Sequence, residues 1–222
     1  MSNPLKILST KILSPIQKNR MIELGARYTE RNFIEIEAIP FTYSETKHTL
    51  LFSSQNAVQS VFSKTDFELL LKNKKCYCVG EKTKASLEEK GLKVTHFEEN
   101  ASNLTDFIIK NDKNKDFLFF CGKERRPDLE AQMEFHKIKL DIVVVYQTKM
   151  KPKPIGAFDI VLFYSPSGVR SFLQDNSLKQ TICICIGPTT AEALPISKRQ
   201  IIIATSPTIE HMIYQTKKQL PS

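Results

Sequence analysis

Four short loops rich in serine and threonine are the segments of this chain best suited to chemistry. They read SSQN (53–56), GEKT (80–83), YSPS (164–167) and GPTT (187–190), and each follows an apolar run and precedes a helical pattern. Serine and threonine cap helix N-termini, and the free N–H groups of a first helical turn attract anions. Capping alone explains any single loop of this kind. Four such loops in one chain predict several sites for carboxylate or phosphate groups.

A fifth loop, GKERRP (122–127), has a different character. Pro127 suits the first position of a helix whose first turn is acidic. Lys123 and Arg126 would flank this helix start and meet acidic groups, whereas Arg125 is interpreted as surface charge. The loop therefore adds cationic side chains to the predicted anion sites.

Other chemistries find little support in the motifs. GEKT lacks the Gly-x-x-x-x-Gly-Lys order of a phosphate-binding loop, and the chain has only seven glycines and no glycine-rich dinucleotide fingerprint, so no cofactor is expected. The four histidines show no metal or triad spacing. All five cysteines lie in short apolar runs, where reduced cysteine packs as a small hydrophobe, so neither a metal nor a disulfide framework is expected. These cysteines are Cys76, Cys78, Cys121, Cys183 and Cys185.

The composition favours a globular protein with an acidic ligand. Of 222 residues, 41% are apolar and 25% charged, and 32 basic against 24 acidic residues give a net charge of +8. The lysine groups at 72–75 and 110–116 lack the aromatic or arginine-rich pattern of a nucleic-acid site. A small polyanionic substrate remains possible as the acidic ligand. No segment has the length of a membrane span and no signal peptide is evident, so a cytoplasmic location without a membrane or nucleic-acid partner is expected.

Short β-branched runs alternate with helical patterns along the chain, which predicts an α/β fold with parallel sheets. A helix is expected over 17–28 and two linker strands over 33–43 and 138–149. The remaining expected strands are 5–10, 48–54, 75–80, 116–122, 159–165, 181–187 and 200–204.

The pattern also repeats in detail, which indicates an internal duplication. LLFSSQNAVQSVF (50–62) aligns with VLFYSPSGVRSFL (161–173), and CYCVGEKTKASL (76–87) aligns with CICIGPTTAEAL (183–194). The two separations, 111 and 107 residues, are nearly equal.

One element breaks the tandem order. The strand–helix unit at 116–133 has no equivalent late in the chain, and its natural counterpart is the segment at 5–24. We therefore expect one discontinuous α/β domain made of residues 1–36 and 148–222. A second domain, 41–144, would be inserted in it.

Six blocks in order resemble the signature segments of uroporphyrinogen-III synthases: FSSQNAV, CVGEKT, CGKERRPDLE, VVYQT, FYSPSGV and IGPTTAEAL, spread over residues 50 to 194. The resemblance implies two flavodoxin-like parallel-sheet domains joined by a two-stranded β-ladder, with the active site in the cleft between them. It also implies the substrate, hydroxymethylbilane, which is a linear tetrapyrrole with eight carboxylates. The implied reaction eliminates water, inverts ring D through a spiro intermediate and closes the macrocycle.

The same resemblance implies roles for individual residues. Tyr146 matches the family tyrosine proposed as the acid for the departing hydroxyl, and Thr190 is assigned with it to catalysis. Thr10-Lys11 stands where Thr-Arg is common, so a point charge replaces an arginine fork there. The residues implied in substrate binding are Thr10, Lys11, Ser53, Ser54, Asn56, Gly80, Thr83, Lys123, Arg126, Ser165, Ser167, Gly168, Gly187 and Thr189.

Two other functional interpretations are compatible with the sequence alone. One is a non-catalytic synthase-like domain that binds a tetrapyrrole or another polyanion, and the other is a sugar-phosphate enzyme that uses the same helix starts. Retention of Tyr146 with Thr83 and Thr190 favours catalysis. The chain is expected to act as a monomer and to receive its substrate from the bilane-producing enzyme.

Overall fold

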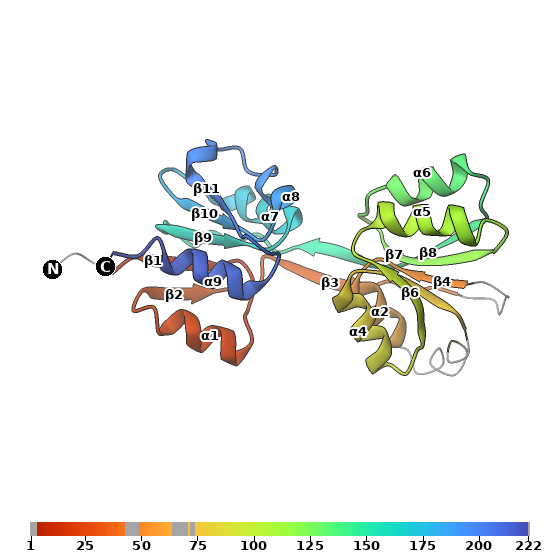
Figure 1. Ribbon diagram of the computed structural model, residues 1–222. Helices are drawn as coiled ribbons and strands as arrows, with labels where there is room; N and C mark the ends of the chain where they lie inside the picture. The colour runs from red at the N-terminus through yellow and green to blue at the C-terminus, as the bar shows by residue number, and fades with distance from the viewer. Residues whose placement is uncertain (1–3, 43–48, 64–70, 72–73, 222) are drawn as a thin grey trace. The chain divides into compact units, whose positions relative to one another are not determined.

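The computed structural model describes residues 4–42, 49–63, 71 and 74–221. His48 and the first two residues of the lysine group at 72–75 lie outside these ranges. The chain divides into two compact units, one of Met1–Glu35 with Lys149–Ser222 and the other of Ile36–Thr148. The sequence places the corresponding boundaries within its two linker strands, 33–43 and 138–149. Figure 1 shows a sheet with helices on both faces in each unit.

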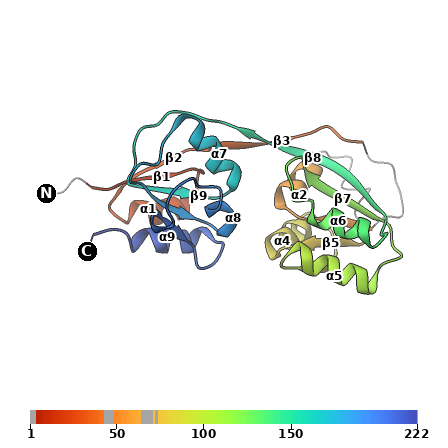
Figure 2. The same ribbon diagram turned by 90° about the horizontal axis from the view of Figure 1, so that it is seen from above.

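The unit of Ile36–Thr148 is built on a sheet with the order β3-β8-β7-β4-β5-β6. All the pairs from β8 to β6 are parallel. The Ile39 N–H donates to the Val145 carbonyl and the Lys151 N–H to the Phe33 carbonyl, so β3 and β8 run in opposite directions as a two-stranded ladder (Figure 2). The strands are β3 (Ile34–Ala38), β4 (Thr49–Phe52), β5 (Cys76–Val79), β6 (Val94–Glu98), β7 (Phe117–Gly122) and β8 (Leu140–Met150).

Helices cover both faces of this sheet, which explains why its central strands are apolar throughout. One core cluster joins Leu50 and Phe52 to helices α2 (Gln55–Phe62) and α4 (Glu81–Glu89). The alternate residue Leu51 faces α5 (Ala101–Asn111) and α6 (Asp128–Phe135) on the other side. Because successive strand side chains point to opposite faces, a strand covered on both faces must be apolar at every position. Every residue of β7 is buried accordingly.

The other unit has a five-stranded parallel sheet with the order β11-β10-β9-β1-β2. Helices α7 and α8 pack on one face, and α1 and α9 pack on the other. The strands are β1 (Lys6–Ser9), β2 (Arg27–Glu30), β9 (Ile160–Phe163), β10 (Ile182–Cys185) and β11 (Ile201–Ile203). The helices are α1 (Pro15–Ile22), α7 (Pro166–Asp175), α8 (Pro188–Ala191), the 3-10 turn η1 (Lys198–Gln200) and α9 (Ile209–Lys217).

The two sheets share one strand order, and the α/β class with two parallel sheets is confirmed. In the aligned repeats β9 corresponds to β4 and β10 to β5, while β1 occupies the place beside β9 that β7 occupies beside β4. The strand order reverses between β4 and β7, and likewise between β9 and β1. Such a reversal is the topological switch point at which doubly wound sheets bind ligands beyond the carboxyl ends of their strands.

Some element boundaries predicted from the sequence are wrong. The helix expected over 17–28 ends at Ile22, because Gly25 adopts a left-handed conformation with φ 74° that closes the helix, and Arg27 begins strand β2. Strand β6 was not anticipated at all. Pro127 caps α6 rather than opening it, and the helix starts at Asp128.

All five cysteines are buried and free. Burial raises the pKa of the Cys78, Cys183 and Cys185 thiols to about 12 and that of Cys121 to about 11, so these groups stay neutral. Such thiols act as small apolar side chains within the sheets. Among the described residues, no helix is long and apolar enough to cross a membrane.

Candidate active site

Tyr146 lies at the switch point of the sheet in the unit of Ile36–Thr148. Its hydroxyl is 3.1 Å from the Ser54 Oγ, at the end of β4, and its main-chain carbonyl accepts the Lys123 N–H, just after β7. The tyrosine ring crosses Gly122: a Cβ built on that residue would be 2.5 Å from Cζ and 2.8 Å from the hydroxyl oxygen. A side chain at position 122 is therefore incompatible with this placement of the tyrosine.

A bulge in the ladder aims Tyr146 in this direction. The pairing of β7 with β8 shifts between Cys121, opposite Val144, and Gly122, opposite Tyr146, so that Val145 is skipped. In consequence Val145 and Tyr146 both pack on the cluster beneath α2 and α4, although neighbours on a regular strand face opposite ways. Bulges re-aim side chains in this manner.

Ser54 connects this tyrosine to a helix start. It is the N-cap of α2, and its Oγ accepts the Ala57 N–H at 3.2 Å. Because that bond uses an oxygen lone pair, the Ser54 hydroxyl keeps its own hydrogen for a further partner. Ser53 and Asn56, on either side, are partly exposed and are able to meet a ligand.

The loop after β5 does not behave as the capping pattern predicts. Gly80 is the N-cap of α4 with φ 84° and offers no side-chain cap, while Thr83 is 5% exposed and points back toward Gly80. Gly187 likewise begins α8 without a side-chain cap. The prediction that Ser or Thr caps each of the four helices is correct for α2 and α7 and wrong for these two.

The cationic loop after β7 divides into exposed and anchored side chains. Lys123 and Arg126 are exposed, as a ligand-facing role requires. Arg125, interpreted from the sequence as surface charge, is instead ion-paired with Glu130 and donates to the Gly122 carbonyl at 3.3 Å. It fixes the turn that carries Gly122 beneath the tyrosine ring.

The second unit brings a matching set of groups to its own switch point. Thr10 is buried, and its Oγ1 donates to the Leu162 carbonyl at 2.7 Å. Ser165 caps α7 by accepting the Gly168 N–H at 3.1 Å, and its Oγ is 3.0 Å from that of Ser167. A Cβ on Gly168 would be 3.3 Å from the Ser165 Oγ and 3.9 Å from the Thr10 Oγ1, so these four residues form one compact group.

The remaining predicted residues of this unit are less clustered. Lys11 is exposed, beside the buried Thr10. Helix α8 has only four residues, in which Thr189 is exposed and Thr190 is 2% exposed. Thr190 therefore lies under the surface of the loop, where its hydroxyl can reach a ligand only after local movement.

A polar network at the same edge was missed from the sequence. The Ser9 Oγ is 2.9 Å from the Tyr164 hydroxyl, and Tyr28 donates to Glu30 at 2.9 Å. Burial raises the pKa of both tyrosines. Although burial opposes ionisation of Glu30, hydrogen bonds from Lys18, the Leu13 amide and Tyr28 lower its pKa. Tyr164 was recoverable from its place directly after a strand. Glu30 falls between the helix expected over 17–28 and the linker strand expected over 33–43, where no element was assigned.

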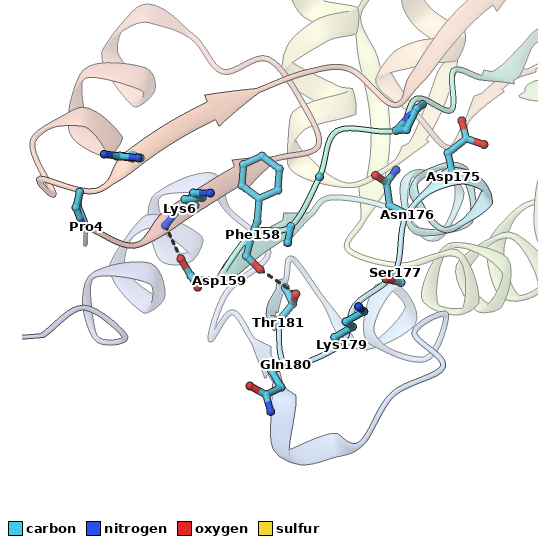
Figure 3. A pocket seen from close by; sticks show the side chains of 14 residues that line it. Pro4, Lys6, Phe158, Asp159, Asp175, Asn176, Ser177, Lys179, Gln180 and Thr181 are labelled. Atoms are coloured by element: carbon cyan, nitrogen blue, oxygen red, sulfur yellow. Dashed lines mark hydrogen bonds between the residues drawn. The ribbon is translucent and has the colours of Figure 1, made fainter. Parts of the chain in front are cut away.

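A large open cavity of about 860 Å³ lies at the opposite, amino edge of this sheet (Figure 3). Its lining includes Lys6 and Arg27, the first residues of β1 and β2, and Asp159 and Thr181, just before β9 and β10. Figure 3 shows the Phe158 side chain beside Lys6, Asp159 and Thr181. None of the residues predicted to bind substrate lines this cavity.

Ser165 and Ser167 in the α7 loop differ in their expected contribution to stability, since Ser165 caps the helix and Ser167 does not. We expect Ser165→Ala to lower the free energy of unfolding by ~0.5–2 kcal/mol, because Gly168 loses its cap acceptor. Ser167→Ala is the matched control and should cost less, since among the described residues the Ser167 side chain bonds the Ser165 hydroxyl alone. Urea denaturation measures both, and equal losses would contradict a cap role for Ser165.

Comparisons with known proteins agree with this architecture. A family model described as "Uroporphyrinogen-III synthase HemD" matches residues 18–214. The "Porphyrin biosynthesis protein HemD" of Ruminiclostridium josui is 28% identical over 250 aligned positions, which cover 96% of this chain and 49% of that protein. The chain thus spans about half the length of the curated relative it matches.

Solved structures support the fold. The uroporphyrinogen-III synthetase of Helicobacter pylori aligns with a TM-score of 0.73 at 21% identity, over 96% of this chain and 99% of that one. A mutant uroporphyrinogen III synthase of Thermus thermophilus aligns with a TM-score of 0.67 at 13% identity, over 96% and 98% of the two chains. With a family model that matches most of its length, the chain belongs to the uroporphyrinogen-III synthase HemD family.

Proposed function

We propose that this chain is a uroporphyrinogen-III synthase, which converts hydroxymethylbilane to uroporphyrinogen III and water. One observation supports the proposal for individual residues. The Tyr146 hydroxyl lies at a switch point, hydrogen-bonded to the Ser54 Oγ, and the tyrosine ring lies across Gly122. Family membership supplies the reaction, and this tyrosine supplies a proton donor at the edge where doubly wound sheets bind ligands.

In the proposed reaction, Tyr146 donates a proton to the hydroxymethyl oxygen as the carbon–oxygen bond breaks and water leaves. Ring D then bonds through its substituted carbon to the methylene carbon that lost the hydroxyl, which gives the spiro intermediate. The older bond from that ring carbon to its bridging carbon breaks, and the freed bridging carbon bonds to the unsubstituted carbon of ring D, which closes the macrocycle with ring D inverted. The ring carbon that forms the last bond loses its own proton, and this proton balances the one that the acid gave. No electrons are exchanged, so the reaction as written consumes no oxidant or reductant.

The protein's main task in this scheme is to control conformation. The bilane is able to close unaided without inverting ring D, so selectivity depends on how its rings are held. We assign the carboxylates to the starts of α2 and α7, where N–H groups and the positive ends of the helices favour anions. Lys123 and Arg126 follow the end of β7, and Lys11 follows the end of β1. These exposed cations at the carboxyl ends of strands complete the proposed binding groups.

The remaining assignments of the proposal rest on the sequence. Thr190 and Thr83 are assigned to the substrate site, although both are buried, and they act only if their loops move. A monomer that accepts bilane from the enzyme producing it, in the cytoplasm, completes the proposal.

The decisive experiment separates isomers. We expect purified protein, supplied with bilane by a bilane-producing enzyme, to give mainly the type III macrocycle, whereas the same mixture without it gives type I. Chromatography of the oxidised products measures the ratio. Unchanged type I product alongside tight tetrapyrrole binding would identify a non-catalytic binding domain instead.

A further inference from the structure

Arg31 carries the one buried side-chain nitrogen or oxygen that lacks a hydrogen-bond partner among the described residues. The atom is Nε of a partly buried guanidinium. A buried donor of a charged group without an acceptor disfavours the folded state, and such groups in proteins are normally paired. The exception calls for a physical reason.

The nearest acid in the sequence is already committed elsewhere. Glu30 receives hydrogen bonds from the Lys18 ammonium at 2.8 Å, the Leu13 amide at 3.1 Å and the Tyr28 hydroxyl at 2.9 Å. Across the described ranges, no salt bridge includes Arg31. The neighbouring carboxylate thus serves the polar network and leaves the guanidinium free.

The backbone of Arg31 is fixed at the carboxyl edge of the sheet. Its N–H donates to the Ser9 carbonyl at 3.0 Å, and two residues later the Phe33 N–H donates to the Thr10 carbonyl at 3.2 Å. Arg31 therefore follows the end of β2 directly and lies beside the end of β1. This is the edge that carries Thr10, Ser165 and the start of α7.

Packing also holds the side chain. The Arg31 Cζ lies 5.9 Å from the centroid of the Phe33 ring, and Phe33 is fully buried with an edge-on contact to Phe172 of α7 at 5.4 Å. The Phe33 carbonyl accepts hydrogen bonds from Lys151 and Ser171. The Phe33 ring beside the guanidinium is thus fixed on the face covered by α7.

We infer that Arg31 binds a carboxylate of the tetrapyrrole, an inference that rests on the function proposed above. A carboxylate accepts two parallel N–H bonds from a guanidinium. A rotation of the side chain that brings the buried Nε to the edge would give Nε the acceptor it lacks. The backbone position beside Thr10 and the start of α7 makes Arg31 a binding residue for the substrate's acidic side chains. A lysine would supply charge here without the planar pair of donors.

The test is calorimetric binding of uroporphyrin III, the oxidised form of the proposed product with the same carboxylates. We expect Arg31→Met to weaken binding about 10- to 100-fold, the range for losing a charged hydrogen bond. The melting temperature should stay the same or rise, because an unpaired buried donor is removed. Arg31→Lys should recover only part of the affinity.

Arg27→Met is the matched control, since Arg27 begins the same strand at the opposite edge and is exposed. An equal loss of affinity in Arg27→Met and Arg31→Met would mean that the loss of one positive charge explains the effect, and it would overturn the inference. So would unchanged binding in Arg31→Met while the wild type makes the type III isomer. A wild type that neither binds uroporphyrin nor makes the type III isomer overturns the proposed function, and the inference with it.

Discussion

Tyr146→Phe should lower the rate of type III isomer formation by ~10²- to 10⁴-fold, the usual contribution of a well-placed general acid. The variant removes the hydroxyl that lies 3.1 Å from the Ser54 Oγ and keeps the ring that packs over Gly122. Uroporphyrin affinity should change little, so the loss should appear in kcat rather than in KM. Steady-state kinetics with isomer analysis measure it, and the bilane left unconverted should close to type I.

Tyr77→Phe is a matched control in the same unit. The Tyr77 hydroxyl is also hydrogen-bonded, to Asp112 after α5, but it is remote from the carboxyl ends of the strands. This variant should lose stability and keep its kcat. If Tyr146→Phe retained most of its type III rate, the hydroxyl would be a structural partner of Ser54 and the acid would have to be another group.

Gly122→Ala should abolish most type III activity although it removes none of the proposed catalytic or binding groups. The new Cβ would lie 2.5 Å from the Tyr146 Cζ, a distance that real contacts do not show, so the ring must leave its position. Overpacking of this kind typically costs ~1–3 kcal/mol of unfolding free energy, which equilibrium denaturation measures. We expect the rate to fall about as far as in Tyr146→Phe.

A double variant tests whether glycine and tyrosine act as one unit. Gly122→Ala combined with Tyr146→Phe should be no slower than the slower single variant, because the second change removes a group already displaced. Gly91→Ala is the control for destabilisation alone: Gly91 has φ 77° with open space around it, so alanine is strained but moves no neighbour. Additive losses in the double variant would contradict a positioning role for Gly122.

Much of the fold was predictable because a strand buried on both faces of its sheet is apolar at every position. FLFFC within β7 and ICIC in β10 are apolar at every position, and each is bounded by a small-residue loop. Strand β2, RYTE, alternates exposed and half-buried residues at the edge of its sheet, and β6 is likewise an edge strand with no fully buried residue. Each of these two edge strands contacts one neighbour only and lacks the apolar run on which the prediction depended, whereas the edge strand β11, III, keeps it.

The site was predictable at the level of loops and not of side-chain directions. Ser54 and Ser165 cap their helices as the pattern indicates. The burial of Thr83 and Thr190 depends on where each helix begins relative to the strand, which residue types alone do not specify. The placement of Tyr146 depends on a bulge and on a glycine 24 positions earlier, and Arg31 is distinguished only by the bond that it lacks.

The strand order also determines the order in which the two sheets can fold during synthesis. Ile7 of β1 pairs with Ile160 of β9, 153 positions later, whereas every parallel pair from β4 to β8 joins segments within Ile36–Thr148. During synthesis, β1 must wait for β9 before its sheet can close, and the inserted half can finish in the interval. Until β9 emerges, β1 exposes an apolar strand edge, so a ribosome-bound chaperone should find a long-lived target at β1.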